Sequence, residues 1–239
     1  MKLLEYLKRS FIVRKCVICE GPIDYDRKTA ICDGCQKYWL TTLDILCDKC
    51  GYESEYCTCG NKELTKHTDF SAFCIFYRSD SSNPVNSILY KLKREYNDEV
   101  FKFCAEHMKN KALKMFAKHN ILKHDFYVTY PTRRKKGIVK YGYDHTELLA
   151  QYFAKALGVK TLRCFENIGK KEQKTLNKRE RFVNARESYR LIDGADVKGK
   201  NFIIIDDVIT SGATVSACAS ILKENGANRI VSVCFAKDI

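Results

Sequence analysis

Short apolar runs alternate along this chain with stretches in which apolar residues recur at helical spacing. The run at residues 202–205 is continuous and β-branched in its last three members, which is typical of a central parallel strand covered on both faces. After it, Val215, Cys218 and Leu222 repeat at helical spacing up to Gly226, where a left-handed cap ends a helix. This segment therefore predicts a strand followed closely by a helix.

The same two patterns recur from residue 71 onward. Tyr96-Asn97 interrupts a long helical pattern, and Asp144 followed by Glu147 gives a capping-box start to a helix that ends near Gly158. Alternating strands and helices are typical of a doubly wound parallel α/β sheet, and this is the fold class we predict. The remaining strands are predicted at residues 71–77, 126–130, 160–165, 188–192 and 229–235, and the remaining helices at residues 86–120 and 144–157.

The N-terminal quarter has a different character, because eight of the thirteen cysteines lie between Cys16 and Cys59. Residues 1–10 predict a short amphipathic helix. No apolar segment approaches the ~20 residues that cross a bilayer, so we expect a cytoplasmic protein without membrane insertion. In that compartment clustered cysteines favour metal over disulfides. We therefore predict two units, a zinc-ribbon module over residues 1–65 and the α/β domain over residues 66–239.

The eight clustered cysteines have the spacing of zinc ligands. Two Cys-x-x-Cys pairs separated by twelve residues match a tetrathiolate zinc ribbon, in which each pair turns onto one tetrahedral ion. The second set ends in a Cys-x-Cys pair, a less usual spacing, and reduced cysteines without metal are the alternative. The pairing and the number of Zn²⁺ ions, one or two, stay open at this point. The predicted ligands are Cys16, Cys19, Cys32 and Cys35, followed by Cys47, Cys50, Cys57 and Cys59.

Two acids and a small-residue turn follow the strand predicted at residues 202–205. Asp206 and Asp207 are expected at the carboxyl end of that strand, where ligands bind in open α/β sheets. Adjacent carboxylates accept hydrogen bonds from vicinal hydroxyls or hold Mg²⁺ through water. The alternative is an ordinary strand-to-helix turn with two surface acids. A phosphate is expected on the backbone N–H groups of the small residues at the helix start, which are Thr210, Ser211, Gly212, Ala213 and Thr214.

Residues 204–214 resemble the PRPP-binding motif of type I phosphoribosyltransferases. The resemblance implies that Asp206 and Asp207 hold the ribose 2′- and 3′-hydroxyls of Mg²⁺-PRPP, and that residues 210–214 hold its 5′-phosphate. Nearly the whole chain is similar to the ComF family of competence-associated proteins, which implies a double zinc ribbon and DNA-uptake proteins as partners. That likeness rests on the Cys-rich start, residues 129–134, residues 142–150, and Gln173, Leu176, Arg181 and Asn184.

Two positions depart from these families. Where ComF proteins typically have Arg-Gly-Phe-Asn-Gln, this chain has Tyr141-Gly142-Tyr143-Asp144-His145, so no role is carried over for that Arg and Asn. Purine-salvage phosphoribosyltransferases have an Asp at the first loop position, where it assists the incoming base, and this chain has Thr210. Without that carboxylate the loop offers no evident general base, which argues against hypoxanthine or guanine salvage.

The formal net charge is +13, and most of the surplus lies before the phosphate motif. Residues 131–190 hold sixteen basic and six acidic side chains, whereas residues 1–60 hold nine of each. By the family resemblance, residues 166–186 correspond to the flexible loop that closes over PRPP, with a solvated basic helix as the alternative. Pyrophosphate is expected near the basic loop that follows the strand at residues 126–130, which contains Arg133, Arg134, Lys135 and Lys136.

Three functions are open from the sequence. A phosphoribosyltransferase would transfer the phosphoribosyl group of PRPP to a nucleophile and release pyrophosphate, and no motif specifies that nucleophile. A binding protein would hold single-stranded DNA or a nucleotide on basic loops interleaved with aromatic residues, acting in DNA uptake through partners. In the third reading the zinc module is a scaffold that completes a hood over the ligand.

Overall fold

The computed structural model describes residues 13–47, 50–52, 57, 59, 64, 66–78, 84–169 and 178–238. The helix predicted for residues 1–10 and the central part of the predicted lid, residues 170–177, lie outside these ranges. Within the described ranges, no helix has both the length and the apolar character that crossing a membrane requires.

A five-stranded sheet forms the centre of the molecule, and all of its strand pairs are parallel. Residues 202–205 are fully enclosed, because both faces of this central strand are covered. The structure therefore confirms the predicted parallel α/β fold. In spatial order the strands are β3 (Phe70–Tyr77), β9 (Ile230–Asp238), β8 (Asn201–Ile209), β4 (Phe126–Thr129) and β5 (Lys160–Thr161).

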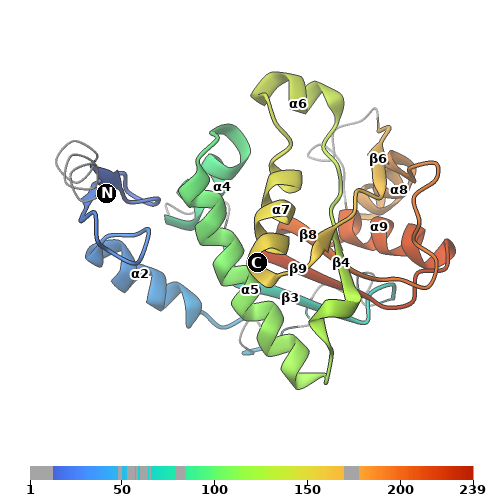
Figure 1. Ribbon diagram of the computed structural model, residues 1–239, viewed down its shortest axis with the longest axis horizontal. Helices are drawn as coiled ribbons and strands as arrows, with labels where there is room; N and C mark the ends of the chain where they lie inside the picture. Colours follow the sequence, from blue (N-terminus) through green and yellow to red (C-terminus); the bar gives the residue numbers. More distant parts are fainter. Residues whose placement is uncertain are drawn as a thin grey trace, which may run out of the picture.

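Helices cover both faces of the sheet (Figure 1). Ile203 and Ile205 pack on one face with side chains from α5 (Asp98–Lys118) and α7 (His145–Leu157). Phe202 and Ile204 pack on the other face with α9 (Ala213–Glu224), beside which lies α8 (Lys178–Ser188). This division follows from the two-residue period of β8, which sends successive side chains to opposite faces.

The predicted helix boundaries rest on polar caps. The long helical pattern is broken as expected into α4 (Pro84–Arg94) and α5, because the Asn97 side chain accepts hydrogen bonds from two N–H groups of the first turn of α5. Asp144 caps α7 in the same way, and Gly158 ends that helix with a φ of 79°. These boundaries confirm the corresponding sequence predictions.

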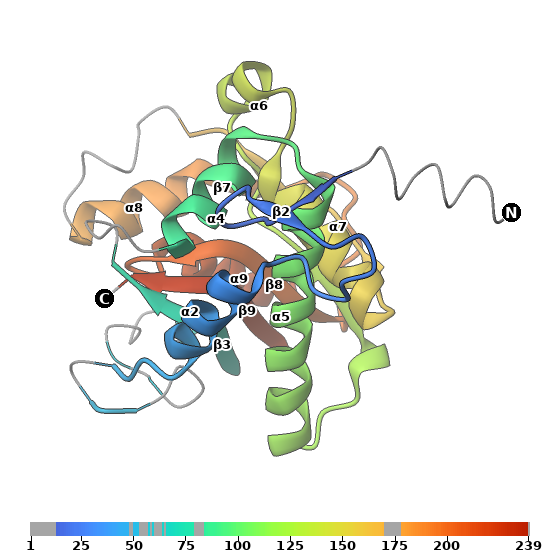
Figure 2. The same cartoon turned by 90° about the vertical axis from the view of Figure 1, so that its left-hand side faces the viewer.

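Two regions differ from the prediction. The strand expected at residues 160–165 is divided, since β5 ends at Thr161 and β6 (Phe165–Asn167) pairs instead with β7 (Tyr189–Leu191) in a separate antiparallel ribbon. The basic loop expected after β4 contains a short helix, α6 (Lys135–Tyr141). This helix projects from one end of the molecule in both views (Figures 1 and 2).

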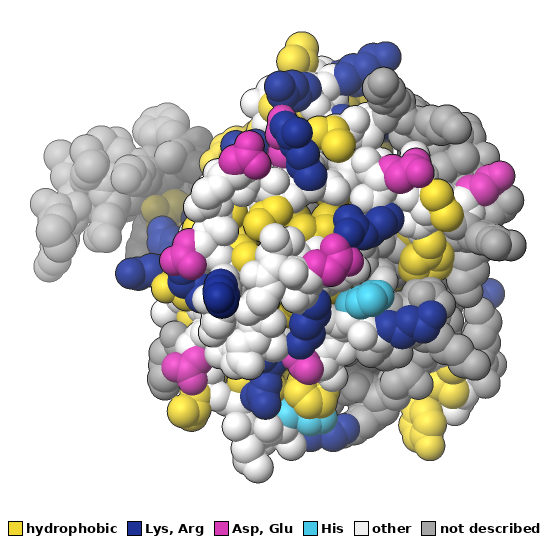
Figure 3. All heavy atoms as spheres, turned by 90° about the vertical axis from the view of Figure 1, so that its right-hand side faces the viewer, with side chains coloured by type: hydrophobic (Ala, Val, Ile, Leu, Met, Phe, Trp, Pro, Cys, Tyr) yellow, Lys and Arg dark blue, Asp and Glu magenta, His cyan; other side chains and the backbone are white. Residues whose placement is uncertain are grey.

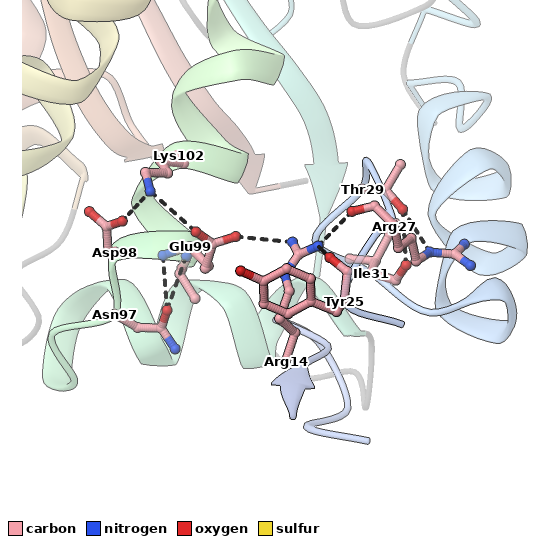
Figure 4. A network of polar contacts seen from close by, with 10 residues as sticks. Arg14, Tyr25, Arg27, Thr29, Ile31, Asn97, Asp98, Glu99 and Lys102 are labelled. Atoms are coloured by element: carbon pink, nitrogen blue, oxygen red, sulfur yellow. Dashed lines mark hydrogen bonds and ion pairs between the residues drawn. The ribbon is translucent and has the colours of Figure 1, made fainter. Parts of the chain in front are cut away.

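The N-terminal module lies in front of α4 and α5 in Figure 2. It consists of the hairpin β1 (Arg14–Lys15) and β2 (Pro22–Ile23) followed by α2 (Asp33–Leu43). Arg14 joins the hairpin to α5: its guanidinium donates to main-chain carbonyl oxygens of the module and lies 3.4 Å from Glu99 Oε2 (Figure 4). This contact fixes the hairpin to the helix that covers the sheet.

A shared core also holds the module in place. Trp39 of α2 is buried, with its ring centroid 5.0 Å from Phe103, 4.9 Å from His107 and 6.0 Å from Phe235. Aromatic contacts of this kind contribute beyond their buried area. The module and the sheet are therefore packed around one continuous core, and the predicted division between residues 65 and 66 stays a prediction.

Candidate functional site

The phosphate loop, residues 210–214, connects the end of β8 to the start of α9. Gly212 is the N-cap of α9 and has a φ of 77°, a left-handed conformation that glycine adopts without strain. Because glycine offers no capping side chain, N–H groups of the first turn must find partners elsewhere. Ser211 Oγ accepts one long hydrogen bond, 3.4 Å from Ala213 N. Small side chains at a helix N-terminus are the arrangement that an anion cradle requires.

The two acids lie within β8 near its carboxyl end, and the strand continues beyond them. The strand is longer than predicted because Val208 and Ile209 still pair with β9. Consecutive side chains of a strand point to opposite faces, so the two carboxylates diverge. Asp207 is buried on the side of α4 and α7, and Asp206 is half-buried on the side of α9. Their role in holding ribose stays a prediction.

The Asp207 carboxylate contacts two basic side chains of the protein, a lysine and a histidine. Lys93 Nζ, at the end of α4, lies 2.9 Å from Asp207 Oδ2, and His145 Nε2, at the start of α7, lies 3.3 Å from the same oxygen. Sequence reasoning missed Lys93, because residues 114 positions apart carry no local signal of contact. In the sequence, His145 stood out only as a departure from the ComF pattern. The structure shows that this residue contacts the Asp207 carboxylate.

The two carboxylates differ in charge because their surroundings differ. Burial and the neighbouring charge of Asp207 raise the pKa of Asp206 well above its ordinary value. Burial alone would also raise the pKa of Asp207, but the Lys93 ammonium and the His145 imidazole outweigh it and hold that pKa well below the usual range. The surroundings therefore shift the pKa values of the two carboxyl groups in opposite directions, so Asp207 loses its proton more readily than Asp206.

The four predicted pyrophosphate residues divide into two groups. Arg133 connects three neighbouring segments. Its main-chain N–H donates to Asp144 Oδ2 at 2.6 Å, and its guanidinium donates to the Lys93 carbonyl at 3.3 Å and lies over the Tyr141 ring. Arg134 is the N-cap residue of α6, and the next two lysines are exposed in the first turn of that helix. The guanidinium of Arg133 therefore contacts Lys93, the residue that pairs with Asp207.

The first cluster is formed by Cys16, Cys19, Cys32 and Cys35, whose sulfur atoms all lie within 4.8 Å of one another. The Sγ atoms of Cys19 and Cys32 are 3.7 Å apart, close to the separation expected for two thiolates on a tetrahedral Zn²⁺ with ~2.3 Å bonds. Burial would raise the pKa of Cys16, but main-chain N–H donors outweigh it and lower that pKa to about 7. A thiolate that accepts main-chain N–H bonds suits a zinc knuckle.

The second cluster is formed by Cys47, Cys50, Cys57 and Cys59, with its sulfur atoms within the same 4.8 Å limit. Gly51 follows Cys50 directly and has a φ of 69°, a left-handed conformation that suits a tight knuckle, while the glycine after Cys59, Gly60, lies outside the described residues. Lys237 is buried beside this cluster, with Nζ 3.3 Å from Cys57 Sγ and 2.6 Å from the Cys59 carbonyl oxygen. The pairing left open by the sequence is thereby resolved into two separate four-cysteine clusters, each with the donor set of a structural zinc site.

Known proteins are similar to this chain both in its C-terminal domain and along nearly its whole length. Residues 139–239 match the family model described as phosphoribosyl transferase domain. The chain is 23% identical over 228 residues to the DNA utilization protein YhgH of Escherichia coli K12, covering 94% of this chain and 97% of that protein. It is 51% identical over 37 residues to the transcriptional regulator GfcR of Methanosphaera stadtmanae, a match to 16% of this chain and 19% of that protein.

Among solved structures, the phosphoribosylpyrophosphate synthetase of Mycobacterium smegmatis superposes with a TM-score of 0.34 and 20% identity, over 59% of this chain and 38% of that chain. An adenine phosphoribosyltransferase superposes with a TM-score of 0.36 and 18% identity, over 63% and 84% of the two chains. Together, the domain match and the full-length relatives agree with the motifs of the sequence: the chain carries a phosphoribosyltransferase domain, and nearly its whole length is similar to the DNA utilization protein YhgH, in line with the resemblance to the ComF family.

Proposed function

We propose that this protein binds PRPP, or a ligand containing ribose 5-phosphate, together with Mg²⁺, and acts in DNA uptake in the cytoplasm. The observation that carries the proposal is the N-terminus of α9 at Gly212, three residues beyond the end of a strand that carries two adjacent carboxyl groups with oppositely shifted pKa values. The full-length relative described as a DNA utilization protein supports the biological setting. The division into residues 1–65 and 66–239 is kept as part of this proposal.

Each part of the site has a distinct task in the proposal. The first-turn N–H groups of α9 bind the 5′-phosphate, because they point along the positive end of the helix dipole. Ionised Asp207 accepts a hydrogen bond from one ribose hydroxyl, and the neighbouring Asp206 carboxyl group accepts from the other. Pyrophosphate faces residues 133–136. Bound Mg²⁺ would neutralise part of the phosphate charge, and the carboxylates and water are the ligands it prefers.

Ligand binding is tested by thermal unfolding. We expect Mg²⁺-PRPP at about 100 times its Kd to stabilise the protein by about 2.7 kcal/mol, or about 5–10 °C for a chain of this size. The double change Asp206→Asn with Asp207→Asn is expected to abolish this shift. Asp193→Asn, at an exposed acid of the same domain, is the matched control and should retain it. An unshifted wild type in saturating ligand would refute the binding proposal.

Turnover is tested separately, because binding and transfer are distinct claims. Pyrophosphate release from PRPP is measured with pooled bases and amines as acceptors. Release that depends on an added acceptor identifies a phosphoribosyltransferase, in which the nucleophile attacks C1′ through an oxocarbenium-like transition state. Binding without release identifies a protein that senses or holds the ligand.

A second candidate function, binding of single-stranded DNA, is favoured by the surface of α6. This helix projects from the domain with Lys135, Lys136 and Lys140 exposed and with Val139 84% exposed. Lysine and arginine side chains gather at this end of the molecule in Figure 3. Lys140 also lies over the Tyr141 ring, so charge and an aromatic face occur together, as on single-strand binding surfaces.

The DNA proposal predicts a steep salt dependence of binding to an oligonucleotide. Changing Lys135, Lys136 and Lys140 to Gln should lower the slope of log K against log salt by about 2, since each phosphate contact on a single strand contributes ~0.7. The same change at Lys155, Lys160 and Lys223, which are exposed elsewhere, is the matched control. Equal slopes for both triple variants would exclude α6 as the DNA contact.

A further inference from the structure

Helix α4 lies between the first cluster and Asp207. On one of its faces, Lys91 Nζ donates to the carbonyl oxygens of Val17 at 3.0 Å and Ile18 at 3.4 Å. One turn earlier on the same face, Ser87 Oγ donates to the Ile18 carbonyl at 3.0 Å. These carbonyl groups belong to residues 16–19, the turn between the first two cysteines, so the knuckle is bonded directly to α4.

The Lys91 contact is costly to lose. Its side chain is buried, with only 5% of the residue exposed, and its ammonium is satisfied by the two carbonyls and by Glu20 Oε1 at 3.0 Å. A buried ammonium that loses such partners carries a large desolvation penalty. If the turn at residues 16–19 unfolds, α4 cannot keep Lys91 where it is, and the helix must shift or loosen.

The opposite end of this link is Lys93. Its ammonium contacts Asp207 at 2.9 Å, while its carbonyl accepts from Arg133 at 3.3 Å and the Leu92 carbonyl accepts from Tyr143 Oη at 3.1 Å. The last turn of α4 is thus held by Arg133, which precedes α6, and by Tyr143, which lies between α6 and α7. Ile88 and Leu92 are fully buried in the same core as residues 16–18, so the inner face of α4 is packed against the module.

We infer that the first cluster is a support for the ligand site: through Lys91 and α4 it holds Lys93 on Asp207, and Lys93 is a positioning residue for that carboxylate. The effect on ligand binding rests on the proposed function, whereas the mechanical link does not. The second cluster contacts the end of β9 through Lys237 and is not part of this path. Loss of metal from the first cluster is therefore expected to loosen α4 and weaken ligand binding at a distance.

The test uses the full-length protein and matched pairs of variants. Cys19→Ser and Cys50→Ser each remove the second cysteine of a Cys-x-x-Cys pair, one from each cluster. Lys91→Met removes the buried ammonium, and Lys102→Met makes the same change at an exposed lysine of α5. Hydrogen exchange of the α4 peptide is measured in each variant, and zinc content is measured in parallel.

We expect exchange of the α4 amides to rise by about tenfold or more in Cys19→Ser and Lys91→Met, and by less than about twofold in Cys50→Ser and Lys102→Met. Equal exchange in all four variants would overturn the inference, as would a rise confined to Cys50→Ser. This readout needs no ligand, so it decides the mechanical link even if wild-type protein fails to bind Mg²⁺-PRPP and the proposed function falls.

The positioning role of Lys93 is tested by measuring the affinity of the wild-type protein and of its variants for Mg²⁺-PRPP. Lys93→Met is expected to weaken Mg²⁺-PRPP binding by about tenfold, because Asp207 loses the cation that keeps it ionised and oriented. Lys93→Arg keeps the charge and should recover most of the affinity, which a purely structural packing role would not predict. Lys91→Met should weaken binding by about threefold. Tighter binding to Lys93→Met would show that the lysine competes with the ligand and would overturn the assignment.

Discussion

The first cysteine pair of each cluster, Cys16/Cys19 in one and Cys47/Cys50 in the other, forms a knuckle with the same main-chain hydrogen bonds. The two knuckles differ in how they are attached to the rest of the domain. In the first, Cys16 N donates to Gly21 O and Glu20 N donates to Cys16 O; in the second, Cys47 N donates to Tyr52 O and Gly51 N donates to Cys47 O, all between 2.8 and 2.9 Å. The Cys-x-x-Cys spacing therefore specifies the turn in both cases. It does not specify what the turn is attached to.

The attachments differ in which atoms receive a buried lysine. Lys91 reaches main-chain carbonyl groups of the first knuckle and the Glu20 carboxylate, which is 61% exposed. Lys237 reaches the Cys57 sulfur itself and the Cys59 carbonyl. A tetrathiolate around Zn²⁺ would bear a net negative charge, which Lys237 would offset directly, whereas Lys91 contacts only the chain around the first cluster. The two lysines therefore have different roles: Lys237 balances the charge of the second cluster, and Lys91 links the first knuckle to α4.

Metal content is expected to give the largest effect. Wild-type protein should bind two Zn²⁺ per chain, and Cys19→Ser and Cys50→Ser should each bind one, because the two clusters have separate ligands. Each loss is expected to lower the free energy of unfolding by several kcal/mol in urea titrations. Zinc is counted by mass spectrometry of the metal. A single cysteine change that releases both ions would mean that the clusters form one coupled centre.

The next largest effect is expected from the buried lysines. Lys237→Met should destabilise the protein by about 3 kcal/mol, since it leaves a buried thiolate site without its cation. Lys91→Met should cost about 1–2 kcal/mol, because it leaves carbonyl groups unsatisfied and removes a pairing to a largely exposed carboxylate. Urea unfolding followed by circular dichroism measures both. A larger cost at Lys91 than at Lys237 would contradict the proposed difference between the attachments.

The docking of the first module should also depend on pH through His107, which packs on Trp39. Burial lowers the pKa of His107 to about 4, against about 6.5 in an unfolded chain. Between these values the unfolded state binds more protons, so stability is lost as the pH falls, by about 1.5 kcal/mol from pH 6.5 to pH 5.

His107→Phe keeps an aromatic ring in place and removes the titration, so its stability relative to wild type should rise by that amount over the same interval. His119→Phe is the control, because His119 lies at the end of α5 against Phe70 and away from Trp39. Urea titrations of the three proteins at pH 6.5 and pH 5 measure the difference. Parallel pH profiles for wild type and His107→Phe would exclude this histidine as the source.

The parts of the fold that the sequence predicted correctly depend on local or repetitive signals. The run Phe202–Ile205 is apolar because it is buried on both faces, and Asn97 and Asp144 cap helices through contacts within three residues. The knuckles follow from Cys-x-x-Cys spacing for the same reason. The end of β8 was predicted too early because acidic residues are rare in strand interiors, and only pairing with β9 shows that the strand continues.

The contacts that define the site were beyond prediction because they join distant positions. Lys93 meets Asp207 only when α4 packs beside the sheet, and Lys237 meets Cys57 across 180 residues of chain. Both lysines looked like ordinary basic residues of a chain with a net charge of +13. Lys237 is distinguished by its burial and Lys93 by its contact with the buried Asp207, and both features depend on the assembled fold.

The smallest expected effect compares the equivalent residue of each knuckle. Glu20 and Gly51 both follow a Cys-x-x-Cys pair and both have a left-handed φ, 63° and 69°. A Cβ added at Gly51 meets no atom within 4 Å, so Gly51→Ala should cost only the left-handed backbone strain, about 1 kcal/mol.

Glu20→Gly relieves the same strain but removes the pairing to Lys91, so the two terms should nearly cancel, leaving a change within about 0.5 kcal/mol. Glu20→Gln keeps the backbone strain and removes only the charge, which isolates the second term. If Glu20→Gly stabilises the protein by the full strain energy, then Glu20 contributes nothing to holding Lys91. The carbonyl groups of Val17 and Ile18 would then account for the whole attachment of α4 to the first knuckle.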